Sequence, residues 1–165
     1  MKKVAFKVGD AVFYPAAGVG KIQGMEDIYV GGQWERCFVI RIQENQVTIK
    51  VPESTAHTSG IRALLSSRKL KELFKVLASE SVARIAAGNS AEYYKQLERK
   101  INTGSCLELG EVVRDLTRQK KRGSLSFDEA RLLETASNFL SREVSLVEGI
   151  PQGTAYDQIR SHIGN

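Results

Sequence analysis

Few residues in this chain have the types and spacing that catalysis needs. Gly18-Val-Gly-Lys21 is close to part of a phosphate-binding loop, but no serine or threonine follows the lysine and the segment opens a strand instead of a helix. His57 stands in a polar segment with no carboxylate or nucleophile at a recognisable spacing. We therefore predict that the chain is not an enzyme, has no catalytic residues and uses no cofactor.

Metal-ligating residues are equally sparse. The chain has two cysteines and two histidines, far apart in the sequence: Cys37, His57, Cys106 and His162. No zinc motif can be assembled from this spacing. We predict no metal site, and we expect both cysteines to be buried or half-buried free thiols without a redox role.

Basic residues form one dense cluster, which consists of Arg118, Lys120, Lys121 and Arg122. Arg114 precedes the cluster by one helical turn, and Arg131 follows the next expected helix cap. Such a cluster can contact phosphates and position a protein on nucleic acid without reading its sequence. It can equally be a solvated helix end, where the helix dipole favours cations. The net charge of +5 is too modest to decide between these two interpretations.

The composition limits the remaining possibilities. A chain of 165 residues with 42% hydrophobic residues can form one large domain or two small ones. No apolar run is long enough to span a membrane, and no apolar stretch follows the basic N-terminus. We expect a cytoplasmic protein without membrane contact.

Residues 1–65 have the pattern of a small β-barrel. Strands are expected at residues 12–14, Lys21–Val30, Trp34–Gln43 and Gln46–Val51, and residues 61–65 lead out of the barrel. Pro15 and Pro52 end strands because proline has no N–H to donate, and Gly31-Gly32 is a hairpin turn signal. In the last of these strands, Val47 is expected to share a face with Ile49 and Val51. Short strands with tight turns favour an SH3-like or Tudor-like five-stranded barrel.

From residue 66 onward the hydrophobic period is that of helices. Helices are expected from Ser66 or Ser67 to Ala78, at residues 90–103, 106–119 and 126–147, with a short segment at 80–87 and a final helix capped by Thr154. Ser126 and Glu129 have the spacing of a capping box, and residues 149–153 break the long helix. The chain is therefore predicted to be an α+β protein of two domains, a barrel at 1–65 and an all-helical domain at 66–165.

Two adjacent tyrosines lie in the helix that begins near residue 90. Tyr94 shares the apolar face with Leu97 and Ile101 and is expected in the core. Tyr93 points elsewhere and is the better candidate for stacking on an exposed base.

Six short motifs follow one another along the chain: Val8-Gly-Asp-x-Val-x-Tyr-Pro-x-x-Gly-Val-Gly20, Ile49-Lys-Val-Pro52, Gly60-Ile-Arg62, Thr103-Gly-Ser105, Glu111-Val-Val-Arg-Asp-Leu116 and Leu125-Ser-Phe-x-Glu129. In order and spacing they resemble the motifs of the CarD/CdnL family of bacterial transcription regulators. The match keeps its spacing over nearly the whole chain. The resemblance implies a Tudor-like domain that docks on the β subunit of RNA polymerase by strand addition. The family's docking positions fall here on Ile28, Val30, Lys50 and Pro52.

The resemblance also implies a helical domain that contacts promoter DNA at the upstream edge of the transcription bubble. Many members insert a tryptophan into the minor groove there, as a wedge that holds a distorted duplex. That position is Ser90 here, and the two basic positions that follow are Glu92 and Tyr93, whereas Lys95 is retained. A further basic position falls on Ala130, beside Arg131. We infer that this protein lacks the wedge and uses a different DNA contact.

These observations predict a monomeric regulator that binds RNA polymerase through residues 1–65 and promoter DNA, independently of sequence, through the helical domain. It would thereby modulate the open promoter complex. The expected DNA-contacting residues are Ser90, Tyr93, Lys95, Arg114, Arg118, Lys120, Lys121, Arg122 and Arg131. Two alternatives stay open: an adaptor that binds the polymerase without a functional DNA contact, and an RNA-binding barrel module.

Overall fold

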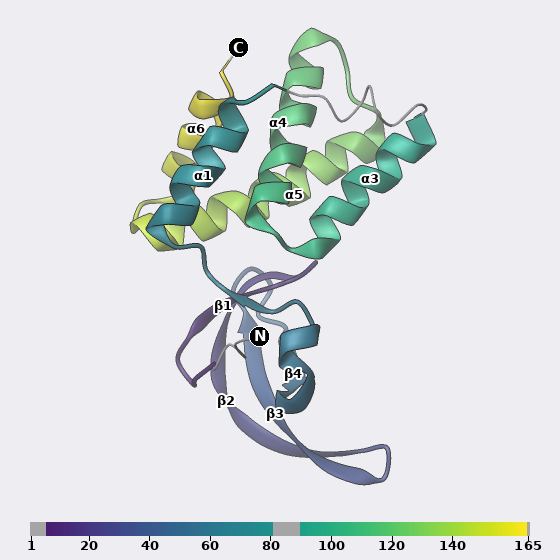
Figure 1. Ribbon diagram of the computed structural model, residues 1–165, viewed down its shortest axis with the longest axis vertical. Coiled ribbons are helices and arrows are strands. Elements are labelled where there is room, and N and C mark those ends of the chain that lie inside the picture. Colours follow the sequence, from purple (N-terminus) through teal and green to yellow (C-terminus); the bar gives the residue numbers. More distant parts are fainter. Residues whose placement is uncertain (1–5, 81–89, 165) are drawn as a thin grey trace. The chain divides into compact units, whose positions relative to one another are not determined.

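The chain places a β-sheet before a set of helices, as the change of hydrophobic period near residue 66 predicts. The computed structural model describes residues 6–80 and 90–164. These form two compact units, one up to Leu64 and one from Leu65 onward, and each is described by itself (Figure 1). The predicted α+β layout is confirmed.

Five strands make one antiparallel sheet in the order β4-β3-β2-β1-β5. The strands are β1 (Ala11–Tyr14), β2 (Gly18–Val30), β3 (Gln33–Ile42), β4 (Thr48–Pro52) and β5 (Arg62–Ala63), and the 3₁₀ helix η1 (Glu53–Thr58) follows β4. The core of the unit consists of Val12, Ile22, Phe38, Ile40, Ile42, Val51, Ala56 and Ile61. Burial of these side chains is the main force that holds the sheet in its bent form.

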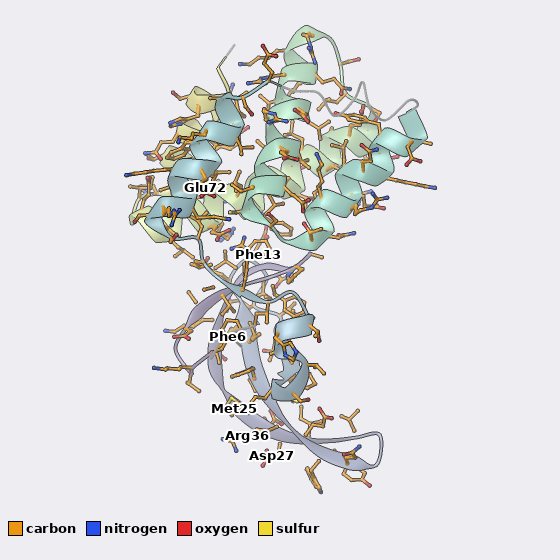
Figure 2. All side chains as sticks on the ribbon, viewed as in Figure 1. Phe6, Phe13, Met25, Asp27, Arg36 and Glu72 are labelled. Atoms are coloured by element: carbon orange, nitrogen blue, oxygen red, sulfur yellow. The ribbon has the colours of Figure 1, made fainter. Side chains whose placement is uncertain are left out.

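Strands β2 and β3 form a long hairpin. Its turn is Gly31-Gly32, as predicted, and both glycines have positive φ angles, of 59° and 84°, which a side chain would strain. The register places Met25 opposite Phe38 and Asp27 opposite Arg36, and Figure 2 shows Met25, Asp27 and Arg36 along this hairpin. A register shift between Ile22 and Gly24 marks a β-bulge, which bends the strand.

The fourth strand begins later than the sequence pattern predicts. Gln46 has a φ of 61°, and the Asn45 side chain accepts a hydrogen bond from the backbone N–H of Val47 at 3.0 Å. These two features continue the turn to residue 47, because the asparagine side chain replaces a strand partner. Val47 is therefore exposed in the turn, and the expectation that it belongs to the strand with Ile49 and Val51 is wrong.

The helical unit contains α1 (Ser67–Ala78), α3 (Ser90–Thr103), α4 (Cys106–Arg122), α5 (Phe127–Glu148) and α6 (Gln152–Ile163). The side chain of Ser66 caps α1, and Ser126 with Glu129 forms the predicted capping box of α5. Gly149 ends α5 in the left-handed conformation. The segment expected at 80–87 lies, except for its first residue, outside the described part of the chain.

Two helix ends differ from the prediction. Helix α4 continues to Arg122 instead of ending near Gln119, because nothing in the basic run breaks a helix before Gly123. Helix α6 begins at Gln152, directly after Pro151, and has no side-chain cap. The predicted cap at Thr154 is therefore wrong: Pro151 occupies the N-cap position, and its carbonyl oxygen accepts the first helical hydrogen bond, from the Ala155 N–H at 3.0 Å.

The crossing of α1 and α4 depends on a glycine. A Cβ atom at Gly110 would lie 2.6 Å from Cδ1 of Leu73, a side chain with no exposed surface. We predict that Gly110→Val destabilises the helical unit by about 2 kcal/mol, since overpacked cores must shift side chains and backbone. Gly153→Val is the matched control, because Gly153 also lies in a helix but has no atom within 4 Å of a Cβ. Urea unfolding followed by the helical circular-dichroism signal would measure both, and equal stability of the two variants would contradict the prediction.

Candidate functional site

Four residues expected to dock a partner lie on one face of the sheet. Side chains opposite each other in register point to the same face, and alternate residues along a strand do too. Ile28 and Val30 of β2 lie opposite Glu35 and Gln33 of β3. Lys50 and Pro52 of β4 lie opposite Val39 and Cys37, which have the same alternation on β3 as Glu35 and Gln33. The structure therefore brings together residues that are up to 24 positions apart in the sequence.

This face adjoins an open strand edge. Strand β4 is the outermost strand of the described sheet on that side, so one row of its backbone N–H and C=O groups has no partner strand there. An extended segment of another protein could pair with this row. The geometry suits docking by strand addition, with the neighbouring side chains providing selectivity.

Lys50 carries the positive charge of this face but is not isolated. Its Nζ atom lies 3.2 Å from the Glu26 carboxylate, and both side chains are about half exposed. Such a pair adds little to stability because water screens it, so the cation remains accessible to an acidic partner.

Cys37 lies on the same face but is buried. Burial raises the pKa of its thiol, and the carboxylates of Glu35 and Glu26 raise it further. A protonated, buried thiol is unreactive at neutral pH. Both cysteines are free and buried, as the sequence predicts.

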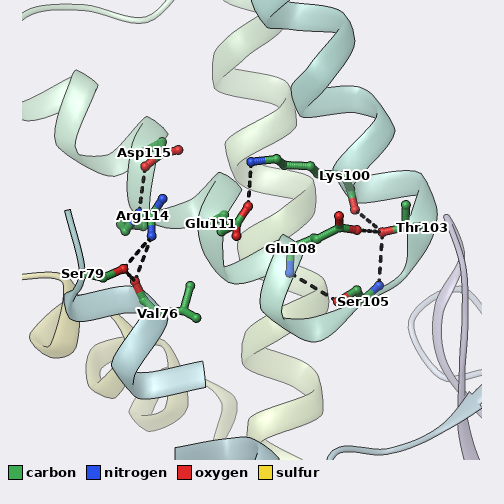
Figure 3. A network of polar contacts seen from close by, with 9 residues as sticks. All are labelled: Val76, Ser79, Lys100, Thr103, Ser105, Glu108, Glu111, Arg114 and Asp115. Atoms are coloured by element: carbon green, nitrogen blue, oxygen red, sulfur yellow. Dashed lines mark hydrogen bonds and ion pairs between the residues drawn. The ribbon is translucent and has the colours of Figure 1, made fainter. Parts of the chain in front are cut away.

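Two of the arginines expected to contact DNA instead hold α1 against α4. Arg114 is 6% exposed and donates to the Val76 carbonyl oxygen at 3.1 Å, to Ser79 Oγ at 2.8 Å and to Asp115 Oδ1 at 2.8 Å (Figure 3). Arg118 donates to the carbonyl oxygens of Leu77 and Ser79 at the end of α1, at 3.1 and 2.6 Å. The last carbonyls of a helix have no partner within it, so cations bind them well.

The same part of the unit is tied together by other polar contacts. Figure 3 shows Lys100 of α3 bound to Glu111 of α4, with Nζ and Oε2 2.6 Å apart. Arg118 also donates to the Ile163 carbonyl oxygen at 3.2 Å, and Lys121 donates to that of Gly164 at 2.6 Å. Arg114 and Arg118 thus serve the fold, and the expectation that they face phosphates does not agree with this geometry. Lys121 stays exposed although it donates to Gly164, so its DNA contact remains a prediction.

Four other cations remain on the surface: Lys95, Lys120, Arg122 and Arg131. Lys120 and Arg122 lie in the last turn of α4, and Arg131 lies in the second turn of α5. Lys95 lies on α3, whose first residue is Ser90. Together with Lys121, which is also exposed, these are the predicted DNA-contacting residues whose charges the described structure leaves accessible.

Of the two adjacent tyrosines, Tyr93 is the more deeply buried, whereas the sequence pattern predicted that Tyr94 would be. Tyr93 is 3% exposed and packs in line with the buried Leu97 and Ile101, at a spacing of four residues along α3. Tyr94 is half-buried at the edge of that stripe. The expectation that Tyr93 stacks on a base is wrong, because its ring belongs to the core.

Four exposed aromatic side chains of the described residues were not identified as site candidates from the sequence: Tyr29, Trp34, Phe127 and the least exposed of them, Tyr156. The rings of Tyr29 and Trp34 pack edge to face near the tip of the β2–β3 hairpin, 5.4 Å apart. Phe127 follows the Ser126 cap directly and is out of phase with the apolar stripe of α5, which is the signal that could have found it.

The part of the chain that the structure describes contains no helix long and apolar enough to cross a membrane. Within the same residues, no group of three or more His, Cys, Asp or Glu side chains could hold a metal ion.

Comparison with known proteins agrees with this division. Residues 6–65 match the CarD-like/TRCF RID domain, and residues 72–160 match the C-terminal domain of CarD. A curated protein of Bacillus subtilis (strain 168), "Putative transcription factor YdeB", is 31% identical over 147 residues, which cover 89% of this chain and 95% of that protein. Both halves of the chain are matched in order by one family. The chain therefore belongs to the CarD/CdnL family of transcription regulators.

Proposed function

We propose that this chain docks on the β subunit of RNA polymerase through its sheet unit and contacts promoter DNA, without sequence preference, through its helical unit. The protein acts in the cytoplasm as a monomer and modulates the stability of the open promoter complex. Its sheet unit, residues 1–65, is a Tudor-like barrel in this proposal, and residues 66–165 are the DNA-contacting domain.

One observation carries the polymerase half of the proposal. Ile28, Val30, Lys50 and Pro52 come from separate strands, yet they share one face beside the open edge of β4. Backbone pairing along β4 would supply affinity, and the Lys50 cation would select an acidic patch on the partner.

The DNA half rests on exposed cations of the helical unit. Lys95, Lys120, Arg122 and Arg131 can neutralise phosphates, which gives weak and salt-dependent binding. Docking on the polymerase would hold this weak contact at the promoter, so the effective concentration of DNA becomes high without a tight DNA site.

A second candidate is an adaptor that binds the polymerase without a functional DNA contact. It is favoured by the placement of Arg114 and Arg118, whose guanidinium groups bind carbonyl oxygens at the end of α1. Promoter footprints that stay the same after neutralisation of Lys95, Lys120, Arg122 and Arg131 would support it.

The first experiment is calorimetric titration of the full chain with the isolated N-terminal lobe of the cognate polymerase β subunit. We expect micromolar binding by the wild type and a loss of about tenfold or more, roughly 1.4 kcal/mol, for Lys50→Glu. Lys7→Glu is the matched control, because Lys7 is an exposed lysine of the same unit outside the docking face. It should bind as the wild type does.

Exchanging the charges of Glu26 and Lys50 distinguishes the loss of a docking cation from a disturbance of the sheet. Lys50→Glu alone places two carboxylates next to each other, so repulsion from Glu26 could disturb the sheet. The double variant Glu26→Lys/Lys50→Glu restores the local pair. If docking needs a cation at position 50, the double variant still binds weakly. No binding by folded wild type would contradict the proposal, and co-purification with RNA would then favour the RNA-binding barrel.

A further inference from the structure

Phe127 is the most exposed large hydrophobic side chain in the described part of the chain, with 78% of its surface open to water. It is the first residue of α5 and is held on an ordered backbone. The Ser126 N–H donates to Glu129 Oε1 at 2.9 Å, and the Glu129 N–H donates to Ser126 Oγ at 3.1 Å. A capping box of this kind fixes the helix start, so the ring is presented to solvent from a defined position.

One cation packs against this ring. The Arg131 guanidinium lies 6.0 Å from the ring centroid, at the distance of a cation–π contact. Residues 118–134 contain five basic and three acidic side chains. One of the acids, Glu129, is turned toward the Ser126 N–H and the Gln119 amide, which lies 3.2 Å away. Lys120 and Arg122 are exposed and lie in the last turn of the preceding helix, α4.

The surroundings distinguish nucleic acid from an apolar protein partner. The residues next to Phe127 in sequence, Ser126 and Asp128, are polar and exposed, and so are Lys120 and Arg122. A protein-docking patch would need contiguous apolar surface around the ring. A nucleobase offers a flat π-face beside phosphate charges, which one aromatic ring with adjacent cations can bind.

We propose that Phe127 stacks on, or inserts beside, a base of distorted or partly single-stranded DNA, while Arg131, Lys120 and Arg122 bind the adjacent phosphates. This inference rests on the DNA contact of the proposed function and assigns it an aromatic anchor. An aromatic side chain at such a place favours unstacked bases over regular duplex, so the contact would select the edge of an opened region.

The test uses the full chain at low ionic strength and a forked DNA with 2-aminopurine at the junction, whose fluorescence changes with base stacking. We expect Phe127→Ala to weaken fork binding about fivefold or more, and Phe127→Trp to retain it. Leu146→Ala is the matched control on the same helix, because Leu146 is also an exposed apolar residue. It should bind as the wild type does, and all three substitutions affect side chains that add little to the core.

The salt dependence of DNA binding distinguishes the contribution of the Phe127 ring from that of the neighbouring cations. Phe127→Ala should leave the slope of log affinity against log salt unchanged, whereas Arg122→Gln should reduce its magnitude by about 1. Wild-type fork affinity and 2-aminopurine signal in Phe127→Ala would overturn the inference while leaving the DNA contact intact. Wild type that does not bind the fork would overturn both the inference and the DNA half of the proposed function. Loss of polymerase binding without loss of DNA binding would show that the ring contacts protein, which also overturns it.

Discussion

Replacing Arg114 by alanine should lower the free energy of unfolding of the helical unit by roughly 3 kcal/mol, the loss expected when one partner of a buried, hydrogen-bonded charge pair is removed. The Arg114 side chain is 6% exposed and joins α4 to the last turn of α1 through the Val76 carbonyl oxygen and Ser79 Oγ. Its removal also leaves the Asp115 carboxylate buried without its cation. Urea unfolding, followed by the helical circular-dichroism signal, would measure the change.

Two further variants define the origin of this loss. In Arg114→Ala/Asp115→Asn the uncompensated negative charge is absent, so the double variant should be more stable than the sum of the two single losses predicts. Lys120→Ala, on the same helix but exposed, should change the stability by no more than about 0.5 kcal/mol. Wild-type stability of Arg114→Ala would contradict the structural role of Arg114. If the loss occurs, weaker DNA binding by this variant must be attributed to unfolding and not to a missing phosphate contact.

The elements with local signals were predictable from the sequence. The capping box of Ser126 and Glu129, the Ser66 cap and the glycine turn at residues 31–32 each depend on neighbouring residues, and the structure has all three. The hydrophobic period likewise placed most helices to within a few residues. The predicted cap at Thr154 was wrong because the helix begins earlier, with Pro151 at the N-cap position and its carbonyl oxygen accepting from the Ala155 N–H.

The roles of the basic residues were not predictable in this way. Arg114 and Arg118 bind groups near the end of α1, more than 30 residues away, and nothing within the basic cluster indicates that partner. Exposed Lys120 and Arg122 belong to the same stretch of sequence. Which cations face solvent depends on the helical phase relative to α1 and α6, and this phase is a property of tertiary packing.

The two tyrosines illustrate the same limit at a finer scale. Tyr93 and Tyr94 both lie within helical reach of Leu97, at four and three residues. Only the position of the neighbouring helices decides which ring is covered, and they cover Tyr93. The four candidate docking residues, in contrast, were named from the family resemblance, and the strand register places them on one face.

Replacing Glu143 should have the second large effect on the stability of the helical unit. The sequence analysis did not assign this residue a structural role. Its side chain has no exposed surface, although it lies within the apolar stripe of α5, and its Oε2 accepts a hydrogen bond from the backbone N–H of Leu65 at 2.8 Å. The two residues are 78 positions apart. We expect Glu143→Ala to destabilise the helical unit by roughly 3 kcal/mol, because it leaves a cavity and a buried N–H without its acceptor.

Glu143→Gln distinguishes the two contributions. The amide has nearly the same shape and retains an oxygen that can accept from Leu65, so the loss should be smaller, about 1 kcal/mol. Hydrogen exchange at the Leu65 amide gives a local readout that a general loss of packing would not imitate. It should become faster in Glu143→Ala relative to the amides of the α5 core, and stay protected in Glu143→Gln. Unchanged protection of Leu65 in Glu143→Ala would mean that another acceptor replaces the carboxylate. The buried Glu143 side chain would then need a role other than accepting the hydrogen bond from Leu65, just before α1.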